Sequence, residues 1–389
     1  MLRQPFILFS LSIKNHYFWQ NFIMKTEKHI FFLLILFFIA SCSKNQDHNA
    51  VEIHPVPVED EISVIMILGD GLGIPQITAA YSKNKYLNLS RFPYSGLMLT
   101  QPADRYVTES GAGATAMFYG FKTNYGYQGV DINQTPQSGL YQELKKTDYK
   151  TAILSTSFLT DASLAAIYRH GTDRYEYEQI ALDYIENYPD FALAGGSIHF
   201  NERSDGLNLL DTLSNKGIQL FYEDSDLSNI ESLPAMGLLY PSRPPYLNDG
   251  RTDFLKNGSI KALQLFKNEP FFLLIEAALI DLGGHDRNID RQIEETLELD
   301  EIAGMMMDYA KGKENILVLV VSDHESGGLS LMQGDGMNYT ANYANDEHSG
   351  NMVAVFAYGP GAEKFTGIID NTDIYFKLSE ILKLNSRIQ

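Results

Sequence analysis

The sequence predicts an α/β fold whose mostly parallel central sheet is flanked by helices on both faces. From Ile62 onward, short apolar runs alternate with segments of helical periodicity, which is the pattern of strands joined by crossover helices. Three runs (VIMIL, FFLLI and ILVLVVS) are almost wholly apolar, as expected of strands buried on both faces. A carboxylate follows each of these runs, so we expect a functional site at the carboxyl edge of the sheet.

The individual elements follow from the same alternation. Apolar runs predict strands at residues 62–68, 95–100, 150–156, 191–195, 217–222, 271–276, 315–322 and 352–358. Helical periodicity predicts helices at residues 74–82, 110–120, 173–187, 258–267, 288–311 and 371–384. We therefore expect one domain over residues 61–389 rather than two.

Composition limits the classes of function. With 44% hydrophobic and 20% charged residues among 389, the chain is typical of a globular protein. The net charge of −19 and the lack of basic stripes argue against nucleic-acid binding, because a phosphate backbone requires clustered cations. The same charge would not attract an anionic substrate, so local cations must hold any phosphate.

The first part of the chain has the pattern of a lipoprotein signal followed by a tether. Residues 30–40 are almost wholly apolar, too few to span a bilayer, and preceded by two lysines. The segment Ile39-Ala40-Ser41-Cys42 resembles a bacterial lipobox, which implies cleavage before Cys42 and lipidation of that cysteine. An ordinary signal with an incidental cysteine is the alternative.

We accordingly expect three regions and a location. Residues 1–41 would be an upstream extension and signal peptide, with Met24 as a second candidate start, and residues 42–60 the lipidated cysteine and a flexible tether. The protein would then be lipid-anchored in the cell envelope, on the periplasmic or outer-membrane side. Because Cys42 is the only cysteine, metal ligands in the domain must be oxygen or nitrogen atoms.

Two motifs early in the domain carry chemistry. Asp70 lies between two glycines at a strand end, where a ligand can approach closely, although ordinary turns have the same pattern. Ser110 begins a predicted helix rich in glycine and alanine, whose N-terminal N–H groups favour an anion such as a phosphoryl group. As an alternative, Ser110 could serve only as the N-cap of that helix.

The stretch ESGAGATA at residues 109–116 strongly resembles the nucleophile motif of the alkaline phosphatase family, D/E-S-A/G-A/G-x-A-T-A. The resemblance extends to GFKTN at 120–124, DASLAA at 161–166 with Arg174 at the family's interval, EAALIDLGGH at 276–285, SDH at 322–324 and EHSG at 347–350. It covers nearly all of residues 62–389 and implies an alkaline-phosphatase-like fold. The short interval between Arg174 and Glu276 argues against a large crown-like insertion.

The resemblance implies a centre of two Zn²⁺ and one Mg²⁺ and assigns ligands to each ion. One zinc would take Asp281, His285 and His348; the second Asp70, Asp323 and His324; and the magnesium Asp70, Ser163 and Glu276, with Asp161 bonded to its waters. Oxygen and nitrogen donors suit these ions, and none of the sets needs sulfur.

The same resemblance implies metal-dependent hydrolysis of small phosphate monoesters at alkaline pH through a phosphoserine on Ser110. Arg174 would clamp two phosphoryl oxygens with its planar guanidinium, and Glu109 would orient that arginine. Many relatives dimerise, so a homodimer is one assembly that the resemblance allows. His170 and His199, which match no motif, are interpreted as structural.

Three positions depart from the family's usual residues. Ser163 replaces Thr, Glu109 replaces the commoner Asp, and Leu282 stands where many members have Lys, His or Trp. Since Leu282 cannot contact phosphate through water, we expect weaker inhibition by inorganic phosphate than in members with a polar residue there. Two other functions stay open: a phosphodiesterase of the same superfamily, and a catalytically silent lipoprotein that binds metal or phosphate. The C/S-x-P-x-R motif of sulfatases is not found at Ser110.

Overall fold

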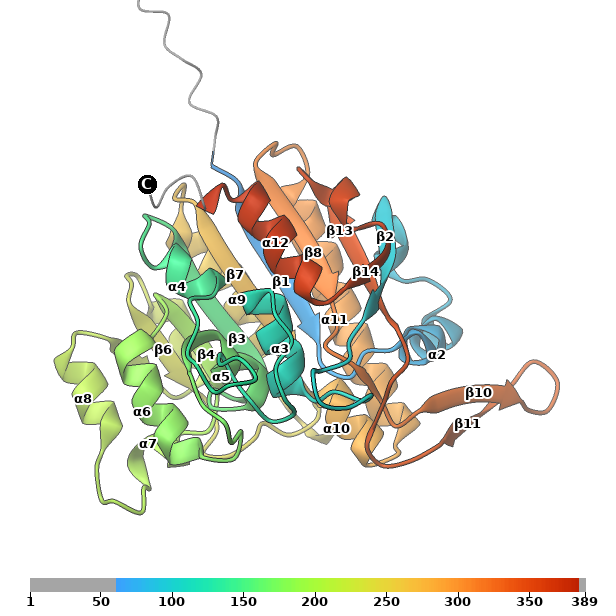
Figure 1. The fold of residues 1–389 in the computed structure, drawn as a ribbon, viewed down its shortest axis with the longest axis horizontal. Coiled ribbons are helices and arrows are strands. Elements are labelled where there is room, and N and C mark those ends of the chain that lie inside the picture. The colour runs from blue at the N-terminus through green and yellow to red at the C-terminus, as the bar shows by residue number, and fades with distance from the viewer. Residues whose placement is uncertain (1–60, 385–389) are drawn as a thin grey trace, which may run out of the picture. The chain divides into compact units, whose positions relative to one another are not determined.

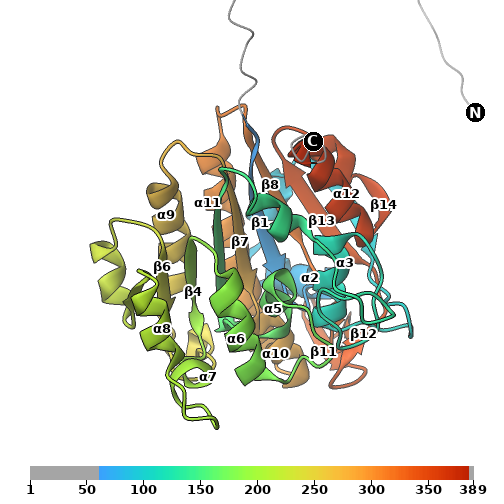
Figure 2. The same ribbon diagram turned by 60° about the vertical axis from the view of Figure 1, so that its left-hand side comes forward.

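A ten-stranded sheet organises the described part of the chain, residues 61–384 of this computed structural model (Figures 1 and 2). From one edge to the other its strands are β14 (Gly367–Asp370), β2 (Tyr94–Leu99), β13 (Val353–Tyr358), β8 (Ile316–Val321), β1 (Ser63–Gly69), β7 (Phe271–Ala277), β3 (Lys150–Phe158), β4 (Phe191–Gly195), β6 (Ala235–Leu238) and β5 (Gln219–Phe221). Strand β13 runs antiparallel to both neighbours, while the other neighbouring pairs are parallel. The predicted α/β class with a mostly parallel sheet is confirmed.

The central strands bring four strand ends to one edge. Every residue of β1, β7 and β8 is buried, because helices cover both faces of the sheet there. In register, Leu68 of β1 lies level with Glu276 of β7 and with Val321 of β8. Ser155 of β3, on the far side of β7, is also level with Glu276. Motifs that are far apart in the sequence therefore reach the same edge.

Helices cover both faces, and side chains of β1 alternate between two apolar cores: Val64, Met66 and Leu68 in one, Ile65 and Ile67 in the other. The first core includes residues of α3 (Ser110–Tyr119), α4 (Leu140–Leu144), α5 (Ala162–Tyr168), α6 (Tyr177–Asn187), α7 (Ile198–Asn201), α8 (Leu209–Asn215) and α12 (Thr372–Ile381). The second includes residues of α2 (Ile74–Asn84), α9 (Phe254–Phe266) and α11 (Ile289–Ala310). In Figure 1 the helices α3, α5 and α12 lie on the near face of the sheet.

Short elements surround the carboxyl edge. Helix α10 (Leu279–His285) follows β7 at once, and the two-residue strands β9 (Glu325–Ser326) and β12 (His348–Ser349) pair with each other. Strands β10 (Leu329–Gln333) and β11 (Tyr339–Tyr343) form an antiparallel hairpin that extends away from the sheet in Figure 1. Turns of 3₁₀ helix are η1 (Asn88–Arg91), η2 (Asp224–Asn229), η3 (Leu247–Asp249) and η4 (Ala362–Phe365). Among the described residues, no helix combines the length and hydropathy that a bilayer crossing requires.

The predicted strands are all present, with small differences at their ends, but β6 and β14 of the sheet and the short strands β9 to β12 were not predicted. The helix predicted at 173–187 begins only at Tyr177, so its first turn was wrong. The buried guanidinium of Arg169 donates to the backbone carbonyl of Asp173 over 3.0 Å and pairs with Glu176, which holds these residues in a turn. That turn carries Arg174.

Candidate active site and metal centre

The ends of β1, β7 and β8 bring together residues that lie far apart in the sequence. Asp70 follows β1, Glu276 lies near the end of β7, and Asp323 and His324 follow β8. All four side chains are buried. Helix α3 adds Ser110 to this group, and helix α10 adds the carboxylate of Asp281. The predicted convergence at the carboxyl edge of the sheet is thus present in the structure.

Ser110 is the first residue of α3, and its hydroxyl faces the carboxylates. The N-cap is Glu109, whose carboxylate accepts hydrogen bonds from the N–H groups of the second and third helical residues over 2.8 and 2.6 Å. The alternative that Ser110 is the N-cap is therefore wrong. Glu109 thus binds two of the N–H groups at the helix start, where the sequence predicts that an anion is favoured. Ser110 Oγ lies 3.3 Å from His324 Nε2 and 3.4 Å from Asp70 Oδ2.

Small residues let α3 lie directly against the strand ends. All ten of its residues are buried, including the glycines and alanines of the motif. A Cβ atom added at Gly113 would lie 3.1 Å from Cβ of Asp323, which is tighter than most such contacts. Glycine at this position therefore allows the close approach that places Ser110 beside His324.

One candidate metal site consists of Asp70, Asp323 and His324, whose ligand atoms lie within 4.8 Å of one another. His324 Nε2 is 3.4 Å from Asp70 Oδ1 and 3.2 Å from Asp323 Oδ2. The backbone N–H of Gly71 donates to Asp323 Oδ1 over 3.2 Å, so the residue after one ligand fixes another. The structure brings together the three residues predicted for the second zinc.

The residues predicted for the first zinc also meet. His285 Nε2 lies 3.0 Å from Asp281 Oδ2, and His348 Nε2 lies 3.4 Å from Asp281 Oδ1. The two histidines approach to 3.3 Å between their Nε2 atoms. Asp281 and His348 form a group within 4.8 Å with His324 as well, and the rings of His324 and His348 stack with centroids 3.6 Å apart. The two candidate sites therefore adjoin each other.

Backbone carbonyls set the orientation of two of these imidazoles. Nδ1 of His348 lies 2.9 Å from the carbonyl oxygen of Thr108, and Nδ1 of His285 lies 2.6 Å from that of Asp346. Because a carbonyl only accepts hydrogen bonds, both Nδ1 atoms carry a proton. In an imidazole that carries its proton on Nδ1, Nε2 is the atom that can bind a metal.

A third group surrounds Glu276. Its carboxylate accepts hydrogen bonds from Ser155 of β3 and Ser163 of α5. Asp161 and Glu276 are both close enough to Asp70 to raise its pKa. The four residues predicted around magnesium thus lie in one region, and Ser155, which no motif identified, joins them.

Arg174 lies between two carboxylates. Its Nη1 is 2.5 Å from Glu109 Oε2, and its Nη2 is 3.5 Å from Asp161 Oδ1. Glu109 is fully buried, so one carboxylate both caps α3 and holds the guanidinium. This is the contact that the predicted orienting role of Glu109 requires.

Arg243 is a second guanidinium at the site, and no sequence motif identified it. It lies in the loop after β6, with Nη2 3.2 Å from Asp161 Oδ2 and Nε donating to Ser157 Oγ over 3.1 Å. Each oxygen of Asp161 therefore has its own arginine. The prediction of weaker phosphate inhibition considered only Leu282. Arg243, from the loop after β6, brings a positive charge to Asp161 that this prediction did not include.

Crowded, buried carboxylates dominate the electrostatics. Burial and the neighbouring carboxylates raise the pKa of Asp70 well above its usual range, that of Glu276 to about 7 and that of Asp323 to about 6. Burial would also raise the pKa of Asp281, but the imidazoles of His348 and His285 outweigh it and hold that pKa below its usual range. The hydrogen bond to Asp281 raises the pKa of His285 to about 9.

This arrangement fits divalent cations. Among the described residues, Asp281 Oδ1 and Asp323 Oδ2 are buried without a hydrogen-bond partner, which is costly unless another ligand satisfies them. The donors around His324 are nitrogen and carboxylate oxygen, which suit zinc, whereas those around Glu276 are all oxygen, which suits magnesium. A bound cation would also offset the repulsion that raises the carboxyl pKa values.

Comparisons with known proteins show the family of this chain. The family model described as Alkaline phosphatase matches residues 62–347 and 337–384. Alkaline phosphatase H of Pseudomonas aeruginosa is 29% identical over 83% of this chain and 85% of its own, and alkaline phosphatase of Escherichia coli (strain K12) is 28% identical over 83% and 86%. The structure of alkaline phosphatase from the Antarctic bacterium TAB5 is 32% identical, with a TM-score of 0.81 over 84% of this chain and 100% of its own. A variant of that TAB5 enzyme has magnesium bound in its M3 site.

We predict that the metal-free protein loses stability as pH rises. A carboxyl group with a raised folded pKa stabilises the fold while it is protonated. This contribution is lost between its unfolded pKa, about 4, and the folded values of about 7 for Glu276 and about 6 for Asp323. The raised pKa of His285 adds a loss of the same sign up to about 9, whereas buried His324, whose pKa is lowered, gives an opposing gain as pH rises through about 6.5. The groups with a raised pKa outnumber it, so the net change is a loss. With a chelator, the melting temperature near pH 8 should be at least about 5 °C below that near pH 5.

Thermal unfolding followed by circular dichroism checks this prediction, with Zn²⁺ and Mg²⁺ restored in a parallel series. The metals should remove most of the difference, because they bind the ionised carboxylates of the folded state. Glu276→Gln should flatten the slope in the chelated protein. Equal slopes with and without chelator would contradict the account.

Proposed function

This chain belongs to the alkaline phosphatase family and hydrolyses phosphate monoesters, and we propose that it does so through a phosphoserine formed on Ser110. The observation that carries this proposal is the environment of Ser110 Oγ, at the start of a buried helix within 3.5 Å of both Asp70 and His324. Arg174, held by Glu109, is placed to receive the phosphoryl oxygens. The substrates would be small phosphate monoesters, and the reaction would run best at alkaline pH.

In the first half-reaction, the Ser110 oxygen forms a bond to phosphorus as the bond from phosphorus to the ester oxygen breaks. Ser110 gives its proton to solvent, and the departing alkoxide takes one up, so the alcohol leaves neutral. The guanidinium of Arg174 binds two non-bridging oxygens and keeps the phosphoryl group in line with the attacking oxygen. Catalysis then depends on positioning and charge stabilisation rather than on further covalent steps.

In the second half-reaction, water forms the new bond to phosphorus and the bond from Ser110 Oγ to phosphorus breaks. Ser110 takes back a proton, and inorganic phosphate leaves. Glu109 stays paired with Arg174 in both half-reactions. Because the same carboxylate accepts hydrogen bonds from the N-terminus of α3, it links the guanidinium to the helix that carries Ser110. Ser110 and Arg174 therefore keep the same position relative to each other.

Metal cofactors are typical of the family, and we propose two Zn²⁺ and one Mg²⁺. The first zinc would be held by Asp281, His285 and His348, the second by Asp70, Asp323 and His324, and the magnesium by Asp70, Ser163 and Glu276, with Asp161 beside them. When bound, the cations would act as Lewis acids that lower the pKa of hydroxyl groups and neutralise charge on phosphoryl oxygens.

We predict that Ser110→Ala lowers monoester turnover by at least about 1,000-fold, because the nucleophile is lost. The measurement is phosphate release near pH 9 from an aryl monoester and from the matching diester, with Zn²⁺ and Mg²⁺ supplied. Acid quenching with radiolabelled substrate should give a phosphoprotein in the parent chain only. The matched control is Ser82→Ala, since that serine is half-buried on α2 and its hydroxyl donates to the carbonyl of Thr78.

The outcomes separate the candidate functions. Preference for the diester would move the protein to the phosphodiesterase alternative. Failure to turn over either ester with all metals bound would favour the silent binding protein. Full activity of Ser110→Ala would end the phosphoserine proposal while leaving monoester hydrolysis intact.

We predict that Arg243→Met weakens inhibition by inorganic phosphate about 5-fold, because Asp161 loses one partner and competes harder for Arg174. The measurement is the phosphate inhibition constant, taken together with kcat for the same monoester. Arg243→Lys should restore part of the affinity, since it keeps the charge but not the fork. An unchanged constant in Arg243→Met would show that Arg243 has no influence on the clamp.

We also propose that Cys42 is lipidated and anchors the domain in the cell envelope; this residue lies outside the described part of the chain. The support is the lipobox-like segment alone. Cys42→Ser should move the activity of the full-length chain from the membrane pellet to the soluble fraction and abolish labelling with radioactive fatty acid. Retention of label would contradict the proposal. Dimerisation stays a prediction from family resemblance.

A further inference from the structure

A row of aromatic rings lies beside the phosphate clamp. Tyr175 and Tyr177 follow Arg174 in the chain, while Phe158 ends β3 and His199 belongs to α7. The rings of Tyr177 and His199 are nearly parallel, at 8°, with centroids 4.7 Å apart. Phe158 meets both edge to face, at 5.7 and 5.0 Å, and Tyr175 meets Tyr177 edge to face at 6.4 Å. Three separate segments thus build one aromatic surface.

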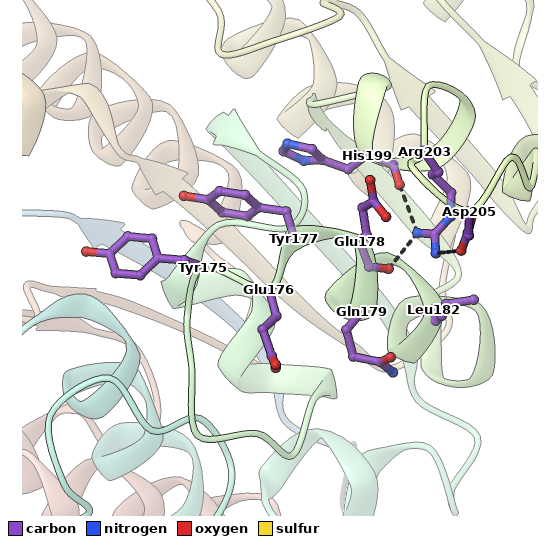
Figure 3. A pocket seen from close by; sticks show the side chains of 9 residues that line it. All are labelled: Tyr175, Glu176, Tyr177, Glu178, Gln179, Leu182, His199, Arg203 and Asp205. Atoms are coloured by element: carbon purple, nitrogen blue, oxygen red, sulfur yellow. Dashed lines mark hydrogen bonds and ion pairs between the residues drawn. The ribbon is translucent and has the colours of Figure 1, made fainter.

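This surface borders a pocket of about 510 Å³ (Figure 3). Figure 3 shows Tyr175, Tyr177 and His199 one after another along one side, with both tyrosine hydroxyls pointing in the same direction. Tyr175 is 66% exposed, and Tyr177 and His199 are half-buried. Part of the ring surface, chiefly that of Tyr175, stays exposed after the aromatic side chains have packed against one another. A further ring can therefore stack there.

The row begins at the clamp itself. The Arg174 guanidinium lies 5.6 Å from the ring centroid of Tyr175, and that of Arg243 lies 4.8 Å from the ring centroid of Phe158. Burial raises the pKa of the Tyr177 hydroxyl, with Asp161 adding to the rise and Arg174 opposing it, so this hydroxyl is within electrostatic reach of the clamp. A phosphoryl group on Arg174 would therefore have this surface beside it.

The charge of the side chains that line the pocket limits which ligands can bind there. Its lining includes three carboxylates; Glu176 is paired with Arg169 and Asp205 with Arg203, whereas Glu178 leaves one net negative charge. Such a lining disfavours a second phosphate group on the same substrate. It favours an uncharged planar ring, whose amino groups can donate to carboxylate oxygens.

We propose that this aromatic row is a leaving-group subsite that stacks the base of a nucleoside monophosphate whose phosphate is held by Arg174. The inference rests on the proposed phosphomonoesterase function and adds a substrate class to it. Stacking of a base on aromatic side chains strengthens binding about 10-fold or more. We expect a higher kcat/KM for nucleoside monophosphates than for diphosphates, because the second phosphate would lie near the carboxylates of the pocket.

The test compares adenosine 5′-monophosphate with ribose 5-phosphate on the metal-loaded protein. Both esters release a primary alkoxide of the same sugar, so they differ chiefly in the ring. We expect kcat/KM to be about 10-fold higher for the nucleotide. Tyr175→Leu with Tyr177→Leu should bring the ratio close to one by lowering kcat/KM for the nucleotide about 10-fold more than kcat/KM for ribose 5-phosphate. The matched control, Tyr175→Phe with Tyr177→Phe, keeps the rings and should keep the ratio.

Other outcomes overturn the subsite or the function separately. Equal kcat/KM for the two esters in the parent chain would overturn the subsite, as would an equal fall for both in the leucine variant, which would indicate displacement of Arg174. If neither ester is hydrolysed, the proposed function fails. Titration calorimetry then tests the subsite alone. Tighter binding of the nucleotide than of ribose 5-phosphate, with the difference lost in the leucine variant, would support the subsite. Equal binding of the two esters would contradict it.

Discussion

The burial of several carboxylates at one edge of the sheet is the constraint on which the rest of the structure depends. Asp70, Glu276 and Asp323 sit at the ends of three adjacent parallel strands, where the backbone register leaves them side by side. Their mutual repulsion and the loss of water raise their pKa values. Apolar packing on both faces holds the strands in this register. Metal affinity is thus prepared by the fold, and folding and metal binding are coupled.

Glu109 connects this metal region to the clamp. One of its oxygens accepts from the backbone N–H groups of Ala112 and Gly126, and the other accepts from Gly111 and Arg174. A single buried carboxylate therefore fixes a helix start, a loop and a guanidinium. Aspartate, the commoner residue in the family, is one methylene shorter and would reach less far. The departure seen in the sequence has a structural use here.

Strong patterns made most of the fold predictable, and weak ones account for what was missed. Strand β8 is wholly apolar and β1 nearly so, whereas β6 and β14 have four residues each, too few to establish a period. Strand β5 has only three residues, but it lies within the longer run predicted at 217–222. The candidate ligands lie in ordered motifs, so family resemblance could name them. Arg243 was missed because nothing local distinguishes it: only the packing of the loop after β6 carries it to Asp161. The turn around Arg174 depended likewise on a buried Arg169.

The charges from Glu109 through Arg174 and Asp161 to Arg243 alternate in sign, and this order explains how the proposed phosphate clamp at Arg174 would be rigid and still bind. Arg174 is held closely at 2.5 Å by Glu109 but only at 3.5 Å by Asp161, whose other oxygen is bound to Arg243. The two carboxylates raise the pKa of Arg174 above its usual range, so its charge is permanent. A phosphoryl oxygen can then replace Asp161 at the loosely held edge of the guanidinium, while Glu109 keeps the other edge in place. Little rearrangement is needed, because the exchanged contact is the weaker one.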